Sequence, residues 1–390
     1  LSPERPLLMV GGHVASLPKR TLAEEECDFV CTGEGFVTVV ELVCALRAGA
    51  GVDKVRGLAY RVGDQIAVSA PAPLVENLDE AVPRQAWDLL DMPLYRAHNW
   101  HCFGEPSRQP YASVYTTLGC PYNCSFCCIQ APFRSGESAT GRKANSYRRW
   151  TPEVVVDQLQ YLSERYGVRH LKFADEMFVL RRDHVEGICE EILRRNLSLN
   201  IWAYARVDTV KDDMIPLLKA AGFNWLALGI ESGNQSVRKD VGKKTATEQI
   251  FATVRRLRDG GINVIGNFIF GLPEDDQKTM EETLQLALEL RCDFANFYST
   301  MAYPGSPLYA RATEQGWPLP ESWSGYSQHA VDALPLRTRH LTGSQVLRFR
   351  DQAFHRYYGD PGYLDFMELK FGPSVREGIE SMAALKLERR

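Results

Sequence analysis

The sequence predicts an α/β protein in which a partial (β/α)6 parallel barrel is preceded by an incomplete doubly wound, Rossmann-like domain and followed by C-terminal helices. Three observations support this class. Six apolar, strand-like segments recur roughly every 30 residues after Tyr111, with amphipathic segments between them, as in successive βαβ units. Two shorter strand and glycine-turn units open the chain, and a Pro-rich stretch separates the two regions.

The first domain is expected over residues 1–70. Two strand-like segments there each lead into a glycine turn and then a helix, and the start of such a helix favours anions. In chain order, the segments and turns are Leu7–Val10, Gly11-Gly12-His13, Cys27–Cys31 and Gly33-Glu34-Gly35. Residues Val55–Val68 predict a small hairpin. Because two units are too few for a complete doubly wound domain, we expect part of the domain to lie upstream of Leu1.

A Pro-rich connector is expected over residues 71–110, the barrel over 111–310 and a helical region over 311–390. Thr151-Pro152 has the pattern of a helix start, and Gly222 and Gly260 stand where helices should end. The expected C-terminal helices are Leu341–Tyr358 and Ser374–Leu387. The expected barrel strands are Ser113–Leu118, His170–Ala174, Asn200–Arg206, Trp225–Ile230, Asn263–Phe270 and Phe294–Met301.

The composition is that of an ordinary folded protein. Of the 390 residues, 45% are hydrophobic and 24% charged, and 45 Lys and Arg against 49 Asp and Glu give a net charge of −4. This balance gives no support for nucleic acid as a partner. Because the chain has neither an apolar run of about 18 residues nor a secretory leader pattern, we expect a cytoplasmic enzyme without a membrane span.

Polar and glycine-rich segments follow the predicted strands. Parallel α/β sheets bind ligands at the carboxyl ends of their strands, so we expect a cofactor mouth there. The segments are Asp175-Glu176, Tyr204 with Arg206, Glu231-Ser232-Gly233, Gly271-Leu272-Pro273-Glu274 and Tyr303-Pro304-Gly305. The alternatives remain open: Asp175 and Glu176 could form rim ion pairs, Glu231 could cap a helix, and the tyrosines could pack under helices.

Three cysteines after the first barrel strand, Cys120, Cys124 and Cys127, are spaced C-x3-C-x2-C. Thiolates from one loop can converge on an inorganic centre, and three ligands on a cubane leave one iron open. A structural zinc site needs four ligands, and the adjacent Cys128 is a poor fourth. The remaining cysteines are expected to be small buried hydrophobes: Cys27, Cys31, Cys44, Cys102, Cys128, Cys189 and Cys292.

The cysteine spacing, with an aromatic before the third cysteine and a six-fold βα pattern, resembles the radical S-adenosylmethionine (radical SAM) superfamily. This resemblance implies that Cys120, Cys124 and Cys127 hold a [4Fe-4S] cluster whose fourth iron binds S-adenosylmethionine. Reductive cleavage of that cofactor would give a 5′-deoxyadenosyl radical.

Further positions follow from the same resemblance. Phe126 would flank the adenine, and the segment Asn267 to Glu274, with Gly271 and Pro273, would lie beside it. Glu231 would lie near the ribose. Where the family has Gly-Gly-Glu after the second strand, this chain has Ala174-Asp175-Glu176, so Asp175 is a less regular candidate for cofactor binding.

The first 70 residues resemble the second half of the cobalamin-binding domain that precedes many radical SAM enzymes. Gly11, Gly12, His13, Gly33 and Glu34 are the candidate cobalamin residues. The Asp-x-His-x-x-Gly segment that supplies an axial histidine in many cobalamin proteins does not occur in the 390 residues. It lies upstream, or cobalamin binds without that ligand, or the domain is vestigial.

The resemblance implies an anaerobic enzyme that uses cobalamin to methylate an unactivated carbon of a small organic substrate. Tyr204, Arg206 and Tyr303 are the candidate catalytic residues, and a flavodoxin or ferredoxin would donate electrons. One alternative is an oxidative cyclase like the anaerobic porphyrin-ester cyclases. Another is a non-catalytic iron–sulfur protein. Three basic pairs are expected at the solvated surface: Arg142-Lys143, Arg148-Arg149 and Lys243-Lys244.

Overall fold

The computed structural model describes residues 5–82, 84–133 and 147–390. The chain divides into two compact units. The first comprises Leu1–Pro83, Leu118–Arg149 and Ala302–Gly316, and the second comprises Arg84–Thr117, Trp150–Met301 and Trp317–Arg390. The domain limits expected from the sequence stay predictions.

The first unit contains a four-stranded sheet in the order β1-β2-β3-β4. Its strands are β1 (Leu8–Met9), β2 (Phe29–Cys31), β3 (Leu58–Val62) and β4 (Gln65–Val68). The β1 and β2 pair is parallel, as the two glycine-turn units predict. The expected hairpin forms from β3 and β4 and extends the sheet by antiparallel pairing with β2.

The helices of the first unit are α1 (Gly12–Ser16), α2 (Pro18–Glu24), α3 (Phe36–Arg47), α4 (Leu78–Ala81) and α11 (Pro307–Glu314). The single helix expected after β1 is two helices, since Pro18 has no backbone N–H and begins a new one. Leu22 of α2 packs on Cys27, Val30 and Ala59 in a small core. The cysteine segment lies between β6 (Thr117–Leu118) and β7 (Arg148–Arg149), which pair with each other.

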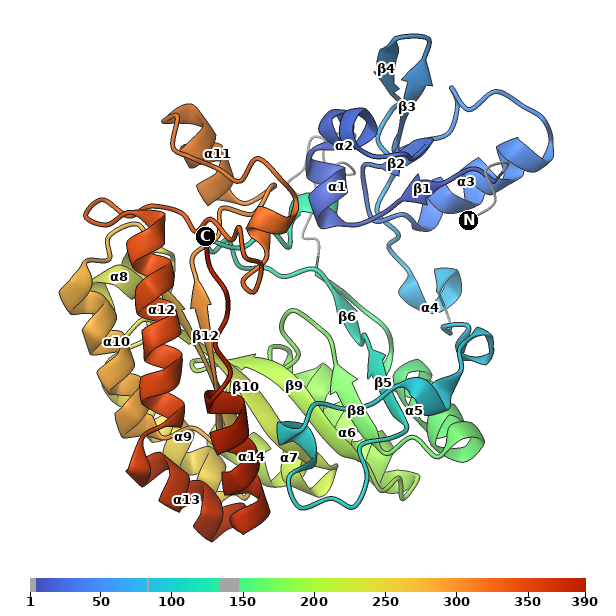
Figure 1. The fold of residues 1–390 in the computed structure, drawn as a ribbon. Helices are drawn as coiled ribbons and strands as arrows, with labels where there is room; N and C mark the ends of the chain where they lie inside the picture. The colour runs from blue at the N-terminus through green and yellow to red at the C-terminus, as the bar shows by residue number, and fades with distance from the viewer. Residues whose placement is uncertain (1–4, 83, 134–146) are drawn as a thin grey trace. The chain divides into compact units, whose positions relative to one another are not determined.

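The second unit is built on a six-stranded sheet in the order β12-β11-β10-β9-β8-β5 (Figure 1). Each neighbouring pair is parallel, which confirms the predicted (β/α)6 arrangement. The strands are β5 (Tyr111–Val114), β8 (His170–Phe173), β9 (Asn200–Arg206), β10 (Phe223–Glu231), β11 (Asn263–Phe270) and β12 (Phe294–Ser299). The connecting helices are α5 (Pro152–Tyr166), α6 (Arg182–Arg194), α7 (Ile215–Ala220), α8 (Gln235–Asp240), α9 (Thr247–Asp259) and α10 (Gln277–Leu290).

The two faces of this sheet differ because successive side chains of a strand point to opposite sides. The face covered by helices is apolar, with Leu171, Ile201 and Leu226 fully buried. The opposite face, here called the inner face, carries a mixture of aromatic and polar side chains that includes Lys172 and Tyr204. A polar inner face on an apolar barrel wall suits a ligand site.

Trp100 closes the amino end of the inner face. It belongs to the short helix η3 (Trp100–Cys102) within the Pro-rich stretch. Its ring lies 5.2 Å from that of Trp202, 5.3 Å from Trp225 and 5.6 Å from Phe294, measured between centroids. The Pro-rich stretch therefore supplies the floor of the half-barrel. Helix α4 and the short helices η1 (Trp87–Leu89) and η2 (Met92–Leu94) precede η3 in this stretch.

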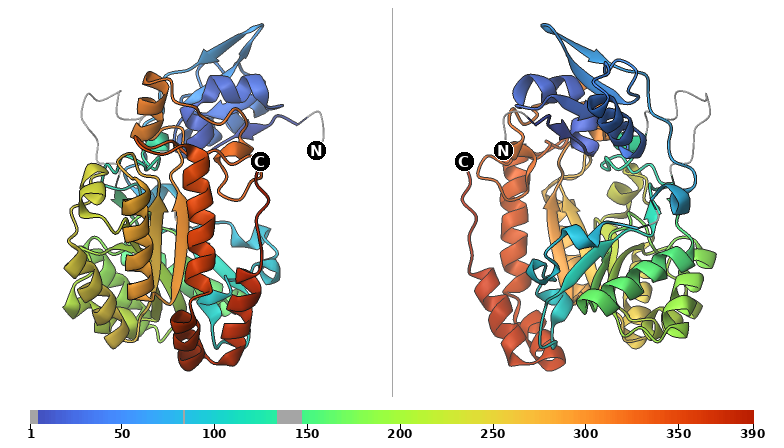
Figure 2. Two further views of the ribbon diagram at one scale, coloured as in Figure 1. Left: turned by 60° about the vertical axis from the view of Figure 1, so that its left-hand side comes forward. Right: turned by 90° about the vertical axis from the view of Figure 1, so that its right-hand side faces the viewer.

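The C-terminal region is helical, as predicted, but has one helix more than expected. The helices are α12 (Gly343–Tyr358), α13 (Pro361–Phe371) and α14 (Pro373–Ala383). Helix α12 runs beside β12 (Figure 2), and the Tyr358 hydroxyl donates to the Ala295 carbonyl at 2.6 Å. The missed helix is α13.

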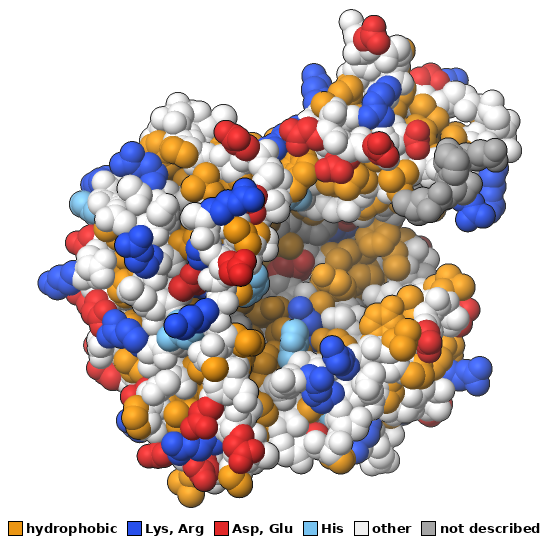
Figure 3. Space-filling view, viewed as in Figure 1, with side chains coloured by type: hydrophobic (Ala, Val, Ile, Leu, Met, Phe, Trp, Pro, Cys, Tyr) orange, Lys and Arg blue, Asp and Glu red, His pale blue; other side chains and the backbone are white. Residues whose placement is uncertain are grey.

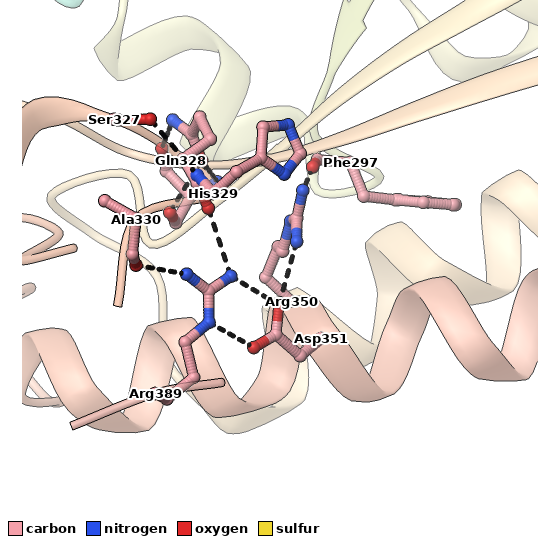
Figure 4. Close-up of polar contacts among 9 residues, drawn as sticks. Phe297, Ser327, Gln328, His329, Ala330, Arg350, Asp351 and Arg389 are labelled. Carbon is pink, nitrogen blue, oxygen red and sulfur yellow. Dashed lines mark hydrogen bonds and ion pairs between the residues drawn. The ribbon is translucent and has the colours of Figure 1, made fainter. Parts of the chain in front are cut away.

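The last residues are fastened to the same unit through Arg389 (Figure 4). Its guanidinium pairs with Asp351 of α12 at 2.9 Å and donates to the Ala330 and Gln328 carbonyls at 2.9 and 3.0 Å. The Gln328 side chain in turn bonds to Ser299 at the end of β12.

Charged side chains of both signs are interspersed over the face in Figure 3, consistent with the near-balanced composition. Within the described residues, no helix combines the length and the apolar character that crossing a membrane requires.

Candidate functional site

Glu231 ends β10 and lies in a buried ion pair with Lys243. Both side chains are under one-tenth exposed, and the Lys243 ammonium contacts the carboxylate through Oε1 and donates to the Gly229 carbonyl at 3.1 Å. Glu231 has φ of +67°, a backbone conformation that costs energy for a residue with a side chain. The register of β10 against β11 shifts between Gly229 and Glu231, an irregularity of the kind that often lies next to functional sites.

Lys243 was expected at the solvated surface, and this prediction is wrong. The ion pair with Glu231 buries it, whereas the adjacent Lys244 is exposed as expected. Lys243 lies beyond α8, and the local sequence carries no sign of its distant partner.

Asp175 follows β8 and is completely buried. Its Oδ1 accepts from the Thr116 and Thr117 amides at 2.6 and 2.9 Å, and its Oδ2 from the Thr116 hydroxyl at 2.5 Å. Burial raises the pKa of this carboxyl to about 6, against the hydrogen bonds that lower it. The Asp175 carboxylate therefore forms no rim ion pair with a described residue and has no exposed surface for a ligand. Its hydrogen bonds instead fix the backbone just before the cysteine segment.

The Gly271 to Asp275 turn follows β11 and is organised by Asp275. That buried carboxylate accepts from the Gly271 and Leu272 amides at 3.0 and 2.9 Å. Gly271 has φ of +81°, and a Cβ there would clash with Val346. Only glycine fits without strain. Pro273 is buried, and its carbonyl accepts from the Arg339 amide at 3.0 Å.

The inner face brings together several predicted residues. Tyr204 and Arg206 project from β9, and Arg206 forms a two-pronged ion pair with Asp208 at 2.9 and 3.0 Å. Asn267 of β11 donates to the Leu228 carbonyl at 3.3 Å and accepts from Asn296 at 3.0 Å. In register, Arg206, Gly229, Asn267 and Asn296 form one row across the sheet.

The cysteine segment belongs to the first unit. Cys120 is buried, while Cys124, Cys127 and the neighbouring Phe126 are half-buried, and none of the ten cysteines forms a disulfide. The Cys127 amide donates to the Cys124 carbonyl at 3.1 Å, which makes a tight turn between the two. Burial raises the pKa of the Cys127 thiol to about 12. Within the described residues, no three His, Cys, Asp or Glu side chains are gathered as a metal site.

This segment is anchored within its own unit. The Leu308 amide of α11 donates to the Ser125 carbonyl at 3.0 Å, and Gln130 donates to the Cys120 carbonyl. Tyr303, which precedes α11, is half-buried. It thus belongs to a different unit from Tyr204 and Arg206.

The other cysteines differ in how far they are buried. Cys27, Cys31, Cys102, Cys189 and Cys292 are buried as predicted, and burial raises the pKa of Cys189 and Cys292 to about 12. Cys44 is exposed, contrary to the prediction, and Cys128 is half-buried.

Glu34 is paired with Arg148 in the first unit. Its Oε2 lies 2.7 Å from the guanidinium, and its Oε1 accepts from the Val75 amide at 2.6 Å. Arg148 was expected at the surface, but its side chain is only 10% exposed, so that prediction is wrong. The pair Arg142-Lys143 lies outside the described residues.

The remaining candidates in the first unit are three residues at the start of α1 and Gly33, which follows β2. Gly11 is its N-cap with φ of 141°, and an added Cβ on Gly12 would meet the Pro132 ring at 3.5 Å. His13 is half-buried, and burial lowers the pKa of its imidazole. Gly33 is buried and accepts from the Cys31 thiol at 3.5 Å.

Comparison with known proteins identifies residues 114–287 as a match to the Radical SAM superfamily. An uncharacterized methyltransferase of Pyrococcus horikoshii is 29% identical over 359 residues, 92% of this chain and 73% of that protein. The anaerobic magnesium-protoporphyrin IX monomethyl ester cyclase of Cereibacter sphaeroides is 30% identical over 362 residues, 90% of this chain and 55% of the cyclase.

Among solved structures, the cobalamin-dependent S-adenosylmethionine radical enzyme OxsB, with aqua-cobalamin and S-adenosylmethionine bound, superposes with a TM-score of 0.66 at 17% identity. The match covers 96% of this chain and 59% of OxsB. The chain thus spans little more than half the length of both the cyclase and OxsB.

Proposed function

Residues 114–287 form a radical SAM domain, and from this premise we propose that Cys120, Cys124 and Cys127 hold the [4Fe-4S] cluster of a radical SAM enzyme. The observation that carries the proposal is the C-x3-C-x2-C spacing in a single loop just after the first barrel strand. The donor set fits, since these thiols form no disulfide and a cubane accepts three from one loop. When bound, the cluster supplies the electron that cleaves S-adenosylmethionine to a 5′-deoxyadenosyl radical.

We further propose that the strand ends of the second unit bind S-adenosylmethionine. Lys243 contacts one oxygen of Glu231 and fixes its orientation, and Oε2 accepts no hydrogen bond from the part of the chain that the structure describes. A carboxylate oxygen of this kind can accept a hydrogen bond from a ribose hydroxyl. The rigid turn at Gly271 and Pro273 and the Asn267 amide would contact the adenine, while Asp175 acts through Thr116 and Thr117. Phe126, which belongs to the first unit, stays a candidate from the sequence.

The reaction that we propose is cobalamin-dependent methylation of an unactivated carbon in a small organic substrate. Its support is the methyltransferase name of the Pyrococcus relative and the cobalamin-dependent OxsB fold. Gly11, Gly12, His13 and Gly33 would contact cobalamin, which supplies the methyl group when bound. Because Glu34 is already paired with Arg148, it would support that site and the cysteine segment together. Tyr204 and Arg206 would contact the substrate, and a flavodoxin or ferredoxin would supply electrons. Tyr303, in the first unit, stays a candidate from the sequence.

A second candidate is oxidative ring closure with the same cofactors. The observation that favours it is the 30% identity to the protoporphyrin ester cyclase over 90% of this chain.

The test is anaerobic reconstitution with iron and sulfide, followed by an assay of 5′-deoxyadenosine with S-adenosylmethionine and reductant. We expect cleavage that Cys124→Ala abolishes and Cys44→Ala, an exposed cysteine outside the loop, retains. Cleavage unaffected by Cys124→Ala would contradict the cluster assignment. With a deuterated S-methyl donor and added cobalamin, label in the product supports methylation, whereas an unlabelled product supports ring closure.

A further inference from the structure

The inner face of the second unit carries a lysine without a carboxylate partner. Lys172 lies on β8, half-buried, and within the described residues it forms no ion pair. Its ammonium lies 4.8 Å from the centroid of the Trp202 ring and 5.4 Å from that of Tyr204. Aromatic faces attract a cation, but they do not neutralise its charge.

Two buried cations at the strand ends are matched to carboxylates. Arg206 pairs with Asp208, and Lys243 pairs with Glu231. Because a partly buried charge without a counterion is costly, an unmatched lysine among two matched cations indicates a counterion that the protein itself does not supply.

Arg108 adds positive charge near Lys172, and no carboxylate of the described residues pairs with either of them. His98 stacks on Trp100 at 5.3 Å, and burial lowers its pKa first, with the charges of Lys172 and Arg108 lowering it further. Arg108 donates to the Asn99 side chain and forms no ion pair with any residue that the structure describes. Glu105, which precedes Arg108 in sequence, pairs with neither cation. Lys172 therefore presents a compact positive charge on this face of the sheet.

Aromatic rings lie beside that charge. The Trp202 ring meets those of Trp100 and Tyr204 edge to face, with centroids 5.2 and 5.1 Å apart. Trp100 and Trp202 are buried in the core, whereas Tyr204 is half-buried and keeps exposed surface. A tyrosine ring binds a planar apolar group well, and the compact charge of a lysine suits a carboxylate.

We propose that the substrate is a planar organic molecule with a carboxylate, which Lys172 binds while the apolar body lies against Tyr204. This assignment rests on the proposed function, which places the substrate on the inner face. Lys172 would then set specificity. A neutral analogue would cover the ammonium group without supplying a counterion, and it would therefore bind more weakly.

The test measures binding of 2-naphthoate and of 2-naphthamide, its neutral analogue, to the reconstituted full chain with S-adenosylmethionine, by equilibrium dialysis. The variants are Lys172→Met, which keeps the aliphatic stem, and Lys172→Arg, which keeps the charge. Lys278→Met on the exposed face of α10 is the matched control. Circular dichroism verifies that each variant is folded.

We expect the unmodified chain to bind naphthoate more tightly than naphthamide, and Lys172→Met to weaken naphthoate binding about 10-fold or more, as loss of a charge-assisted hydrogen bond requires. Lys172→Arg and Lys278→Met should retain the preference. Equal binding of the two probes by the unmodified chain, or unchanged naphthoate binding in Lys172→Met, would overturn the proposal. Cleavage of S-adenosylmethionine, assayed on the same samples, reports separately on the proposed function.

Discussion

The buried pair of Glu231 and Lys243 predicts a large loss of stability when one partner is removed. Lys243→Met keeps the side-chain length but leaves the Glu231 carboxylate buried without its cation. Breaking a buried pair in this way costs about 3–5 kcal/mol, and loss of the hydrogen bond to the Gly229 carbonyl is part of that cost. The adjacent Lys244 is exposed, so Lys244→Met should change stability by less than about 0.5 kcal/mol.

A double-mutant cycle separates the pair from the burial of each side chain. Glu231→Gln removes the negative charge but keeps the shape, and it leaves the buried ammonium with an uncharged partner. In the double variant no unpaired charge remains. Its loss in free energy of unfolding should therefore be smaller than the sum of the losses of the two single variants by more than about 1 kcal/mol. Urea unfolding of the full chain, followed by tryptophan fluorescence, gives the four free energies of unfolding.

Two results would refute this reasoning. If Lys243→Met lost no more stability than Lys244→Met, the pair would not be a buried charge pair in solution. If the losses in the cycle were additive, the two side chains would not interact.

Three further predictions concern the strand ends and the C-terminal segment. Gly271→Ala should lower the free energy of unfolding by at least about 2 kcal/mol, because Gly271 has a positive φ and an added Cβ would clash with Val346. Adding Val346→Ala should restore only the part of the loss that comes from the clash. Urea unfolding measures both changes. Burial raises the pKa of Asp175 from 3.8 to about 6, so the folded chain binds this proton more tightly than the unfolded chain, and stability falls as pH rises between these values. The stability of Asp175→Asn relative to the unmodified chain should therefore rise by about 2–3 kcal/mol from pH 4 to pH 7, and urea midpoints that move in parallel would contradict this. Arg389→Met should speed hydrogen exchange of residues 385–390, while unchanged exchange would mean that the guanidinium does not hold them.

The sheet of the second unit could be predicted closely because its strands are apolar and bounded by glycines and polar turns. The limits of β9 and β11 agree with the prediction to the residue. Helix α13 was missed because Pro361-Gly362 has the composition of a turn. In the structure Pro361 is the first residue of the helix and Asp360 caps it, so an Asp-Pro start was the available signal.

The cysteine spacing is local, and the sequence therefore predicts that part of the candidate site directly. The partners of Glu34 and Glu231 could not be predicted, because Arg148 and Lys243 are brought to them by the fold over long separations. Both basic residues lie in pairs of like charge, a pattern typical of solvated surface. Lys172 was missed for a related reason, since a lone lysine in a strand gains meaning only from its neighbours across the sheet.

The tryptophan floor of the half-barrel has a consequence for the order in which the chain is made. Trp100 leaves the ribosome before Trp202, Trp225 and Phe294, its packing partners. At about 5–20 residues per second, the roughly 190 residues between Trp100 and Phe294 take about 10–40 s to synthesise. During that interval a large aromatic side chain has only part of its final environment, so the nascent chain exposes apolar surface until the last strand is added. Synthesis of this protein therefore passes through a period in which chaperone binding competes with aggregation.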